Sequence, residues 1–235
     1  MSEIIPAILP VDFNDLEEKL GMVAGRVSMV HIDVMDATLT KDSSWPYKGE
    51  QTEFLKIVDE VEGFPFWEET SFEAHFMVKN PEDMFEDWIR AGAERIIVQF
   101  EAFKDGSELS EALNNFKKRF GSATTFVGVE IGLSVDMDTS LEEIYPHVLE
   151  ADFIHFMSID SIGKQGNEFD PKIFNRIKEF KLKFPTTTIS VDGGVNLDNV
   201  EELIASGVNR LIVGSAIFGT ENPEEALEEF LEIIG

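Results

Sequence analysis

The segment VHIDVMD, residues 30–36, alternates apolar side chains with side chains that can bind a metal ion or move a proton. Because successive side chains of a β-strand point to opposite faces, His31, Asp33 and Met35 share one face of the predicted strand. Valine and isoleucine occupy the other face. The segment therefore predicts a strand with one apolar face and one face that can bind a ligand.

Two later segments place further ionisable residues on strands. In EAHFM, residues 73–77, the side chains of Glu73, His75 and Met77 share one face, and the strand segment ISVD ends with Asp192. Imidazole nitrogens and carboxylate oxygens, in a chain without a thiolate, suit a borderline divalent ion such as Zn²⁺, Fe²⁺, Mn²⁺ or Co²⁺. If the three segments meet in the fold, they predict a binding site for such an ion.

Eight short apolar segments alternate with amphipathic stretches along the chain. Helix starts are marked where Asn80, Asp170 and Asn222 each precede a proline. Eight strands alternating with helices, at about 29 residues a unit, predict an α/β fold: a single (β/α)₈ TIM barrel over residues 1–235. The predicted strands cover residues 3–9, 28–35, 71–78, 95–100, 124–131, 152–159, 187–192 and 210–215.

A barrel of this kind brings the candidate residues together. Inward side chains near the carboxyl ends of the strands line the mouth, so two histidines and two carboxylates from three strands converge there. A single strand histidine is more often a hydrogen-bonded core residue, and we interpret His147 and His155 in that way. The methionines would ordinarily be core filling. The joint pattern favours a metal site, because an unpaired buried charge costs several kcal/mol.

The composition excludes several classes of partner. Acidic residues outnumber basic residues by 46 to 19, for a formal charge of −27, which disfavours binding to nucleic acid or to an anionic membrane. The acidic excess suits solvated outer helices, with adaptation to high salt as the alternative. The chain has no cysteine and no long apolar run, and its first residues lack a basic region, so we expect a soluble cytoplasmic protein without a signal peptide. The oligomeric state stays open, a homo-oligomer included.

The segments HIDVMD, AHFM, VDGGVN and VGSAIFG, with the opening PAILPVDF, occur in an order and spacing that resemble the ribulose-phosphate 3-epimerase family. The resemblance covers nearly the whole chain. It implies one bound divalent metal ion, proton transfer by Asp33 and Asp192, and methionines beside the reacting carbons. The implied metal ligands are His31, Asp33, His75 and Asp192, and the implied methionines are Met35, Met77 and Met157.

Glycine-rich turns predict a site for a phosphorylated sugar. Loops after strands seven and eight of such barrels often hold phosphate through backbone N–H groups, and here they contain Gly193 and Gly194, then Gly214 and Ser215. Lys164, after the sixth strand, could add a positive charge. Backbone dipoles would allow a net-acidic protein to bind an anionic substrate. The loop after the sixth strand, SIGKQGNEF, keeps two glycines of the family's glycine-rich loop, Gly163 and Gly166.

Other positions depart from the family pattern. Ala7 stands where the family usually has serine, Gln99 and the segment GLSVDMD replace family-typical sequence, and the glycine-rich loop after the sixth strand is altered in order. The residues that match the family's metal ligands and proton-transfer groups are all present, whereas the positions expected to recognise the substrate differ. A different ketose phosphate, such as D-allulose 6-phosphate, and a non-catalytic sugar-phosphate-binding paralogue therefore stay open as alternatives.

The resemblance implies a metal-dependent isomerase of the pentose phosphate pathway that interconverts D-ribulose 5-phosphate and D-xylulose 5-phosphate. Inverting a carbon beside a ketone requires one acid/base group on each face, and a divalent ion can stabilise the enediolate. A decarboxylase or aldol-type lyase of the same barrel group would be expected to carry Asp-x-Lys-x-x-Asp on a strand. HIDVMD has no lysine, which disfavours that class.

Overall fold

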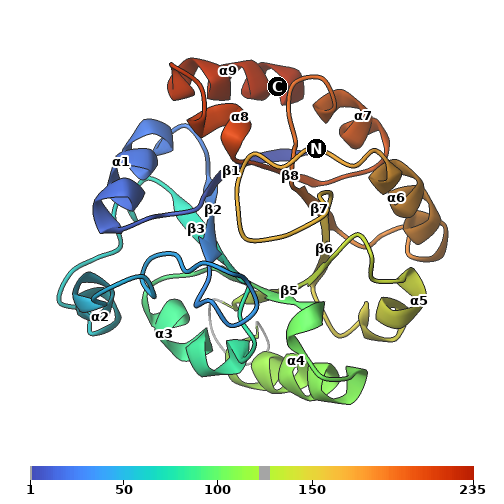
Figure 1. The fold of residues 1–235 in the computed structure, drawn as a ribbon, viewed down its shortest axis with the longest axis horizontal. Coiled ribbons are helices and arrows are strands. Elements are labelled where there is room, and N and C mark those ends of the chain that lie inside the picture. Colours follow the sequence, from blue (N-terminus) through green and yellow to red (C-terminus); the bar gives the residue numbers. More distant parts are fainter. Residues whose placement is uncertain (1, 122–127) are drawn as a thin grey trace.

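The computed structural model describes residues 2–121 and 128–235, and its eight strands form one closed parallel barrel in the order β1 to β8 (Figure 1). The predicted (β/α)₈ barrel is confirmed. The strands are β1 Glu3–Ile8, β2 Met29–Val34, β3 Ser71–Phe76, β4 Arg95–Gln99, β5 Glu130–Val135, β6 Phe153–Met157, β7 Ile189–Asp192 and β8 Arg210–Val213.

Helices surround the barrel (Figure 1), and no helix in the described ranges is long and apolar enough to cross a membrane. The α-helices are α1 Phe13–Val23, α2 Thr52–Val58, α3 Phe85–Arg90, α4 Gly106–Phe120, α5 Leu141–Ile144, α6 Lys172–Lys183, α7 Val200–Ala205, α8 Ser215–Phe218 and α9 Pro223–Ile234. Short 3₁₀ helices cover η1 Pro81–Met84, η2 Phe100–Ala102 and η3 Tyr145–His147.

The helix starts follow the capping residues of the sequence. The side chain of Asn222 accepts a hydrogen bond from the backbone of Glu225 at the start of α9, whose first residue is a proline. The Asn80–Pro81 pair opens the 3₁₀ helix η1, which leads into α3. After the Asp170–Pro171 pair, helix α6 begins at Lys172. The side chains of Asn222 and Asp170 thus accept a backbone hydrogen bond at a helix start, whereas the side chain of Asn80 does not.

The fifth strand begins and ends later in the chain than predicted. The predicted segment was 124–131, of which 124–127 lies outside the described residues, whereas β5 covers Glu130–Val135. Gly132 lies inside this strand, and a Cβ at this position would lie 2.4 Å from the ring of Phe153. The Phe153 ring therefore accounts for a glycine within the strand.

Most of the apolar core lies between the barrel and its helices, whereas the barrel interior is largely polar. At the amino-terminal end of the strands, the Arg95 guanidinium lies 3.1 Å from a carboxylate oxygen of Glu73 and 3.2 Å from one of Glu130. Arg210 lies 2.9 Å from Glu130. These ion pairs close the base of the barrel, and Glu73 extends from them toward the centre.

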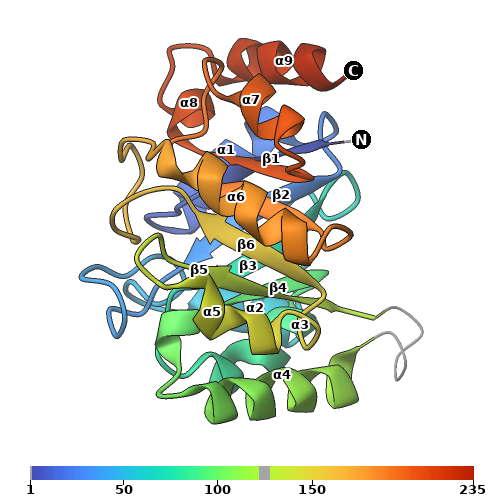
Figure 2. The same ribbon diagram turned by 90° about the vertical axis from the view of Figure 1, so that its right-hand side faces the viewer.

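The segments that follow β2 and β6 lie at the opposite end of the barrel from these ion pairs (Figure 2). The side chain of Gln165, after β6, donates a hydrogen bond of 2.9 Å to the carbonyl of Ala7 in β1. A Cβ on Gly163 would lie 2.8 Å from the methyl group of Thr40, which follows β2. The segment after β6 therefore crosses the barrel mouth.

Candidate metal centre

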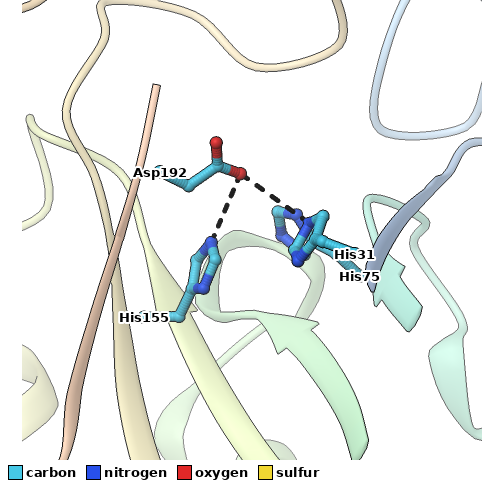
Figure 3. Close-up of side chains that lie close together, drawn as sticks. All are labelled: His31, His75, His155 and Asp192. Carbon is cyan, nitrogen blue, oxygen red and sulfur yellow. Dashed lines mark ion pairs between the residues drawn. The ribbon is translucent and has the colours of Figure 1, made fainter. Parts of the chain in front are cut away.

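Buried side chains from four strands meet at the carboxyl-terminal end of the barrel (Figure 3). His31 comes from β2, His75 from β3 and His155 from β6, while Asp192 is the last residue of β7. One nitrogen or oxygen of each residue lies within 4.8 Å of the others, and all three imidazoles are fully buried. Asp33 of β2 lies beside them and is 8% exposed. The predicted ligands are thus brought together in space.

The spacing of the donor atoms suits one metal ion. Asp33 Oδ1 lies 3.4 Å from His31 Nε2 and 3.4 Å from His75 Nδ1. Asp192 Oδ2 lies 3.8 Å from His31 Nε2. An ion bound at about 2.1 Å holds tetrahedrally arranged donors about 3.4 Å apart. These three donor–donor distances are close to those that a single metal ion requires.

Glu73 determines which nitrogen of His31 faces the centre. Its Oε1 lies 2.8 Å from His31 Nδ1, and both side chains are fully buried. Burial tends to raise the pKa of Glu73, but the hydrogen bond with His31 and nearby positive charges lower the pKa to about 2. The ionised carboxylate accepts a hydrogen bond from Nδ1–H, so Nε2 is the ring nitrogen that faces Asp33 and Asp192.

Gln99 orients His75 in a similar way. The amide nitrogen of Gln99 donates to Asp136 Oδ1 at 2.7 Å, and its amide oxygen lies 3.0 Å from His75 Nε2. Burial, and then the Glu101 carboxylate, raises the pKa of Asp136 to about 6, so Asp136 is mostly ionised at neutral pH and accepts that hydrogen bond. His75 Nε2 then donates to Gln99, which leaves Nδ1 for the centre.

The centre contains buried nitrogens that lack partners. His31 Nε2, His75 Nδ1 and both ring nitrogens of His155 have no hydrogen-bond partner among the described residues. Such an atom costs about 1–3 kcal/mol when it stays unsatisfied. A bound cation would satisfy the nitrogens that point inward, and the donor set fits a borderline divalent ion.

The electrostatics of the centre favour a positive charge. Burial alone would lower the pKa of His31, but the Asp33 and Glu73 carboxylates outweigh burial and hold that pKa well above its usual value. Burial would raise the pKa of Asp33, yet its contacts with His31 and His75 lower the pKa strongly. A positive charge is therefore stabilised here, whether a proton or a metal ion carries it.

The interpretation of His155 as a hydrogen-bonded core residue is wrong. Its Nε2 lies 3.5 Å from Asp192 Oδ2, and its ring stacks on that of His31 with centroids 5.5 Å apart. Burial is the main cause that lowers the pKa of His155 to about 4, so the ring is neutral at neutral pH. Its place two residues before Met157 on β6 was the available signal, because alternate residues share the inward face.

The same interpretation holds for His147. Its Nδ1 lies 3.1 Å from the Ser110 hydroxyl and 2.9 Å from Glu150 Oε2, and the residue is 8% exposed. The contacts join α4 to η3 on the outside of the barrel. His147 is the core histidine that the sequence predicts.

A cavity lies next to the candidate metal centre. Asp33 and Asp192 line one part of it together with Met77 and Met157. Met35 is buried, and its sulfur lies 3.4 Å from where a Cβ on Gly163 would be. The predicted phosphate-binding residues in the lining are Gly163, Gly166, Gly193, Gly194, Gly214 and Ser215, with Lys164 beside them.

Two glycines allow a close approach of backbone at this cavity. A Cβ on Gly194, whose φ is +67°, would lie 2.7 Å from the backbone nitrogen of Phe169. A Cβ on Gly214 would lie 2.8 Å from the side chain of Gln165. A side chain at either position would collide with these neighbours, which accounts for glycine in the turns after β7 and β8.

Replacing Glu73 by glutamine is expected to weaken Zn²⁺ binding by about 10- to 100-fold, because it removes the charge behind the His31 nitrogen. Competition with a chromogenic chelator measures the affinity. Glu130→Gln is the matched control, since Glu130 shares the Arg95 partner but does not touch His31. Equal losses of affinity in both variants would show that Glu73 has no specific effect on His31.

Known structures share the fold. KGPDC from Streptococcus mutans has a TM-score of 0.68 at 15% identity, covering 99% of this chain and 97% of that one. A 3-hexulose-6-phosphate synthase has a TM-score of 0.62 at 18% identity, covering 99% of this chain and 100% of that one. At these identities the similarity concerns the barrel alone.

Proteins related to this chain in sequence identify its family more specifically than the structures that share its fold. The ribulose-phosphate 3-epimerase of Schizosaccharomyces pombe is 27% identical over 227 residues, which is 96% of this chain and 91% of that protein. The enzyme of the same name from Aquifex aeolicus is 27% identical over 229 residues, or 95% and 93% of the two chains. The sequence model of the Ribulose-phosphate 3 epimerase family matches residues 3–218. The chain therefore belongs to the ribulose-phosphate 3-epimerase family.

Proposed function

We propose that this protein is a metal-dependent 3-epimerase that interconverts D-ribulose 5-phosphate and D-xylulose 5-phosphate. The observation that carries the proposal is the position of two carboxylates, Asp33 on β2 and Asp192 on β7, in the lining of one cavity beside the candidate metal centre. Epimerisation needs a proton-transfer group on each face of the reacting carbon. Two carboxylates from different strands of the barrel supply such a pair. Membership in the family supports the same reaction.

One divalent ion, Zn²⁺, Fe²⁺, Mn²⁺ or Co²⁺, would be held by His31, Asp33, His75 and Asp192. When bound, it would act as a Lewis acid toward the negative charge that develops on the sugar oxygens. Glu73 and Gln99 support this role, because their hydrogen bonds fix the two imidazoles so that His31 Nε2 and His75 Nδ1 face inward.

Proton transfer is assigned to the two aspartates. In the direction from ribulose to xylulose phosphate, one carboxylate removes the C3 proton and the resulting carbanion is delocalised as an enediolate. The other carboxylic acid returns a proton to C3 from the opposite face, which inverts that carbon. The strongly lowered pKa of Asp33 keeps it ionised in the resting site. Met77 and Met157 in the cavity lining exclude water and do not donate protons to the intermediate.

The phosphate group would bind at the glycine-rich side of the cavity. Backbone N–H groups at the predicted glycines and Ser215 would donate hydrogen bonds to the anion, and Lys164 would add a charge from the segment after β6. This arrangement favours a small phosphorylated sugar as the partner of a chain whose net charge is −27. We place the enzyme in the cytoplasm and in the pentose phosphate pathway.

A second candidate substrate stays open, because Ala7 and the segment after β6 depart from the family pattern. The Gln165 side chain of that segment contacts the carbonyl of Ala7 and lies against Gly214. The alternative substrate is a six-carbon ketose phosphate such as D-allulose 6-phosphate. The alternative of a non-catalytic binding protein retains the same cavity but predicts no proton exchange.

Incubating D-ribulose 5-phosphate with metal-replete protein in deuterated water should incorporate solvent deuterium at C3 as the epimer forms. Asp33→Asn and Asp192→Asn should each lower the rate by about two to four orders of magnitude, as expected for loss of a general acid or base. NMR spectroscopy of the sugar measures both quantities.

Metal content must be determined for each aspartate variant, because both residues are also proposed ligands. D-Allulose 6-phosphate is assayed in parallel, and faster exchange with that sugar would support the second candidate. An absence of exchange at C3 with both sugars would reject the epimerase proposal and favour the binding protein.

Replacing Lys164 by methionine should raise KM for D-ribulose 5-phosphate by about two- to fivefold, the effect of an exposed ion pair, with kcat and metal content unchanged. Steady-state kinetics measure this change. Lys172→Met is the matched control, because Lys172 is paired with Asp170 and lies outside the cavity. If unphosphorylated D-ribulose reacts as well as its phosphate ester, the phosphate site is assigned wrongly.

A further inference from the structure

The side chain of His155 is buried in the barrel with both ring nitrogens unpaired. Its neighbours in the strand register are Ser134 on β5 and Ser190 on β7, and neither hydroxyl has a hydrogen-bond partner among the residues described. No protein group in the described part of the chain therefore satisfies the imidazole. A buried polar ring that lacks a protein partner requires another explanation.

The Nε2 atom of His155 faces the candidate metal centre. It lies 3.5 Å from Asp192 Oδ2, which in turn lies 3.8 Å from His31 Nε2 (Figure 3). Two donors bound to one ion at about 2.1 Å are at most about 4.2 Å apart. Both distances fall within this limit. The position of His155 therefore permits it to bind the same ion as Asp192.

We propose that His155 is a third imidazole donor of the metal centre, in addition to the four ligands of the proposed function on which this inference rests. Three imidazoles beside two carboxylates favour ions such as Zn²⁺, Fe²⁺ or Co²⁺ over Mn²⁺ or Mg²⁺, which prefer oxygen donors. His155 is thus a residue that determines metal selectivity. With His155, strand β6 contributes a ligand to a metal centre whose other ligands come from β2, β3 and β7.

Direct coordination can be observed in the unmodified protein. The chain has four histidines, His31, His75, His147 and His155, so the imidazole nitrogens of protein labelled with ¹⁵N-histidine can be assigned individually. One equivalent of ¹¹³Cd²⁺ should produce scalar coupling between cadmium and one nitrogen of each of three histidines. His147, on the outside of the barrel, should show no coupling and serves as the internal control.

The outcomes separate this inference from the proposed function. Coupling to His31 and His75 without His155 would overturn the third donor and leave the proposed metal centre intact. Coupling to no histidine would reject the centre and His155 together. Coupling to all three residues supports both.

A second measurement uses variants. His155→Gln should weaken Zn²⁺ binding by at least about tenfold and should weaken Mn²⁺ binding less, so that the ratio of the two affinities falls. His147→Gln should leave both affinities unchanged. A purely structural histidine would predict no change in this ratio, and an unchanged ratio in folded His155→Gln protein would overturn the proposal. Circular dichroism checks that each variant is folded.

Discussion

The hydrogen bond between Glu73 and His31 is the interaction on which the candidate centre depends most. It joins a fully buried carboxylate to a fully buried imidazole over 2.8 Å, and Arg95 contacts the other oxygen of Glu73 from the base of the barrel. A buried ion pair of this kind contributes little net stability, but it fixes the geometry of the groups that it connects. The ion pairs at the amino-terminal end of the strands thereby orient a donor atom at the opposite end.

This connection runs through a barrel interior that is largely polar. In many barrels of this fold, layers of branched apolar side chains fill the interior. Here the separate interior apolar cluster consists of Ile5, Ala7, Met29 and Ile212 among the described residues. Carboxylates, imidazoles and arginines occupy much of the remaining interior, and apolar packing is left to the interface between strands and helices. The fold thus separates the groups that stabilise it from the groups that carry the proposed chemistry.

The sequence was sufficient to predict the barrel and the convergence of His31, Asp33, His75 and Asp192, because alternation along a strand and parallel strand order are local, repetitive signals. The sequence does not show which side chains on different strands contact each other. Glu73 was placed on the correct face, yet nothing in EAHFM indicates that its partner is His31. Gln99 was noted only as a departure from the family pattern, although it orients His75. His155 is a different case, because its alternation with Met157 along β6 is a local signal that places it on the inward face.

In the proposed metal centre, the barrel holds one divalent metal ion between the imidazoles and carboxylates at its mouth. Anomalous diffraction can locate this ion when it is recorded at the absorption edge of the metal in crystals of the protein prepared with Zn²⁺. We expect one strong anomalous peak, about 2.0–2.2 Å from His31 Nε2, His75 Nδ1 and the nearer oxygens of Asp33 and Asp192. A structure with Zn²⁺ bound only elsewhere on the acidic surface, and no peak at this point, would contradict it.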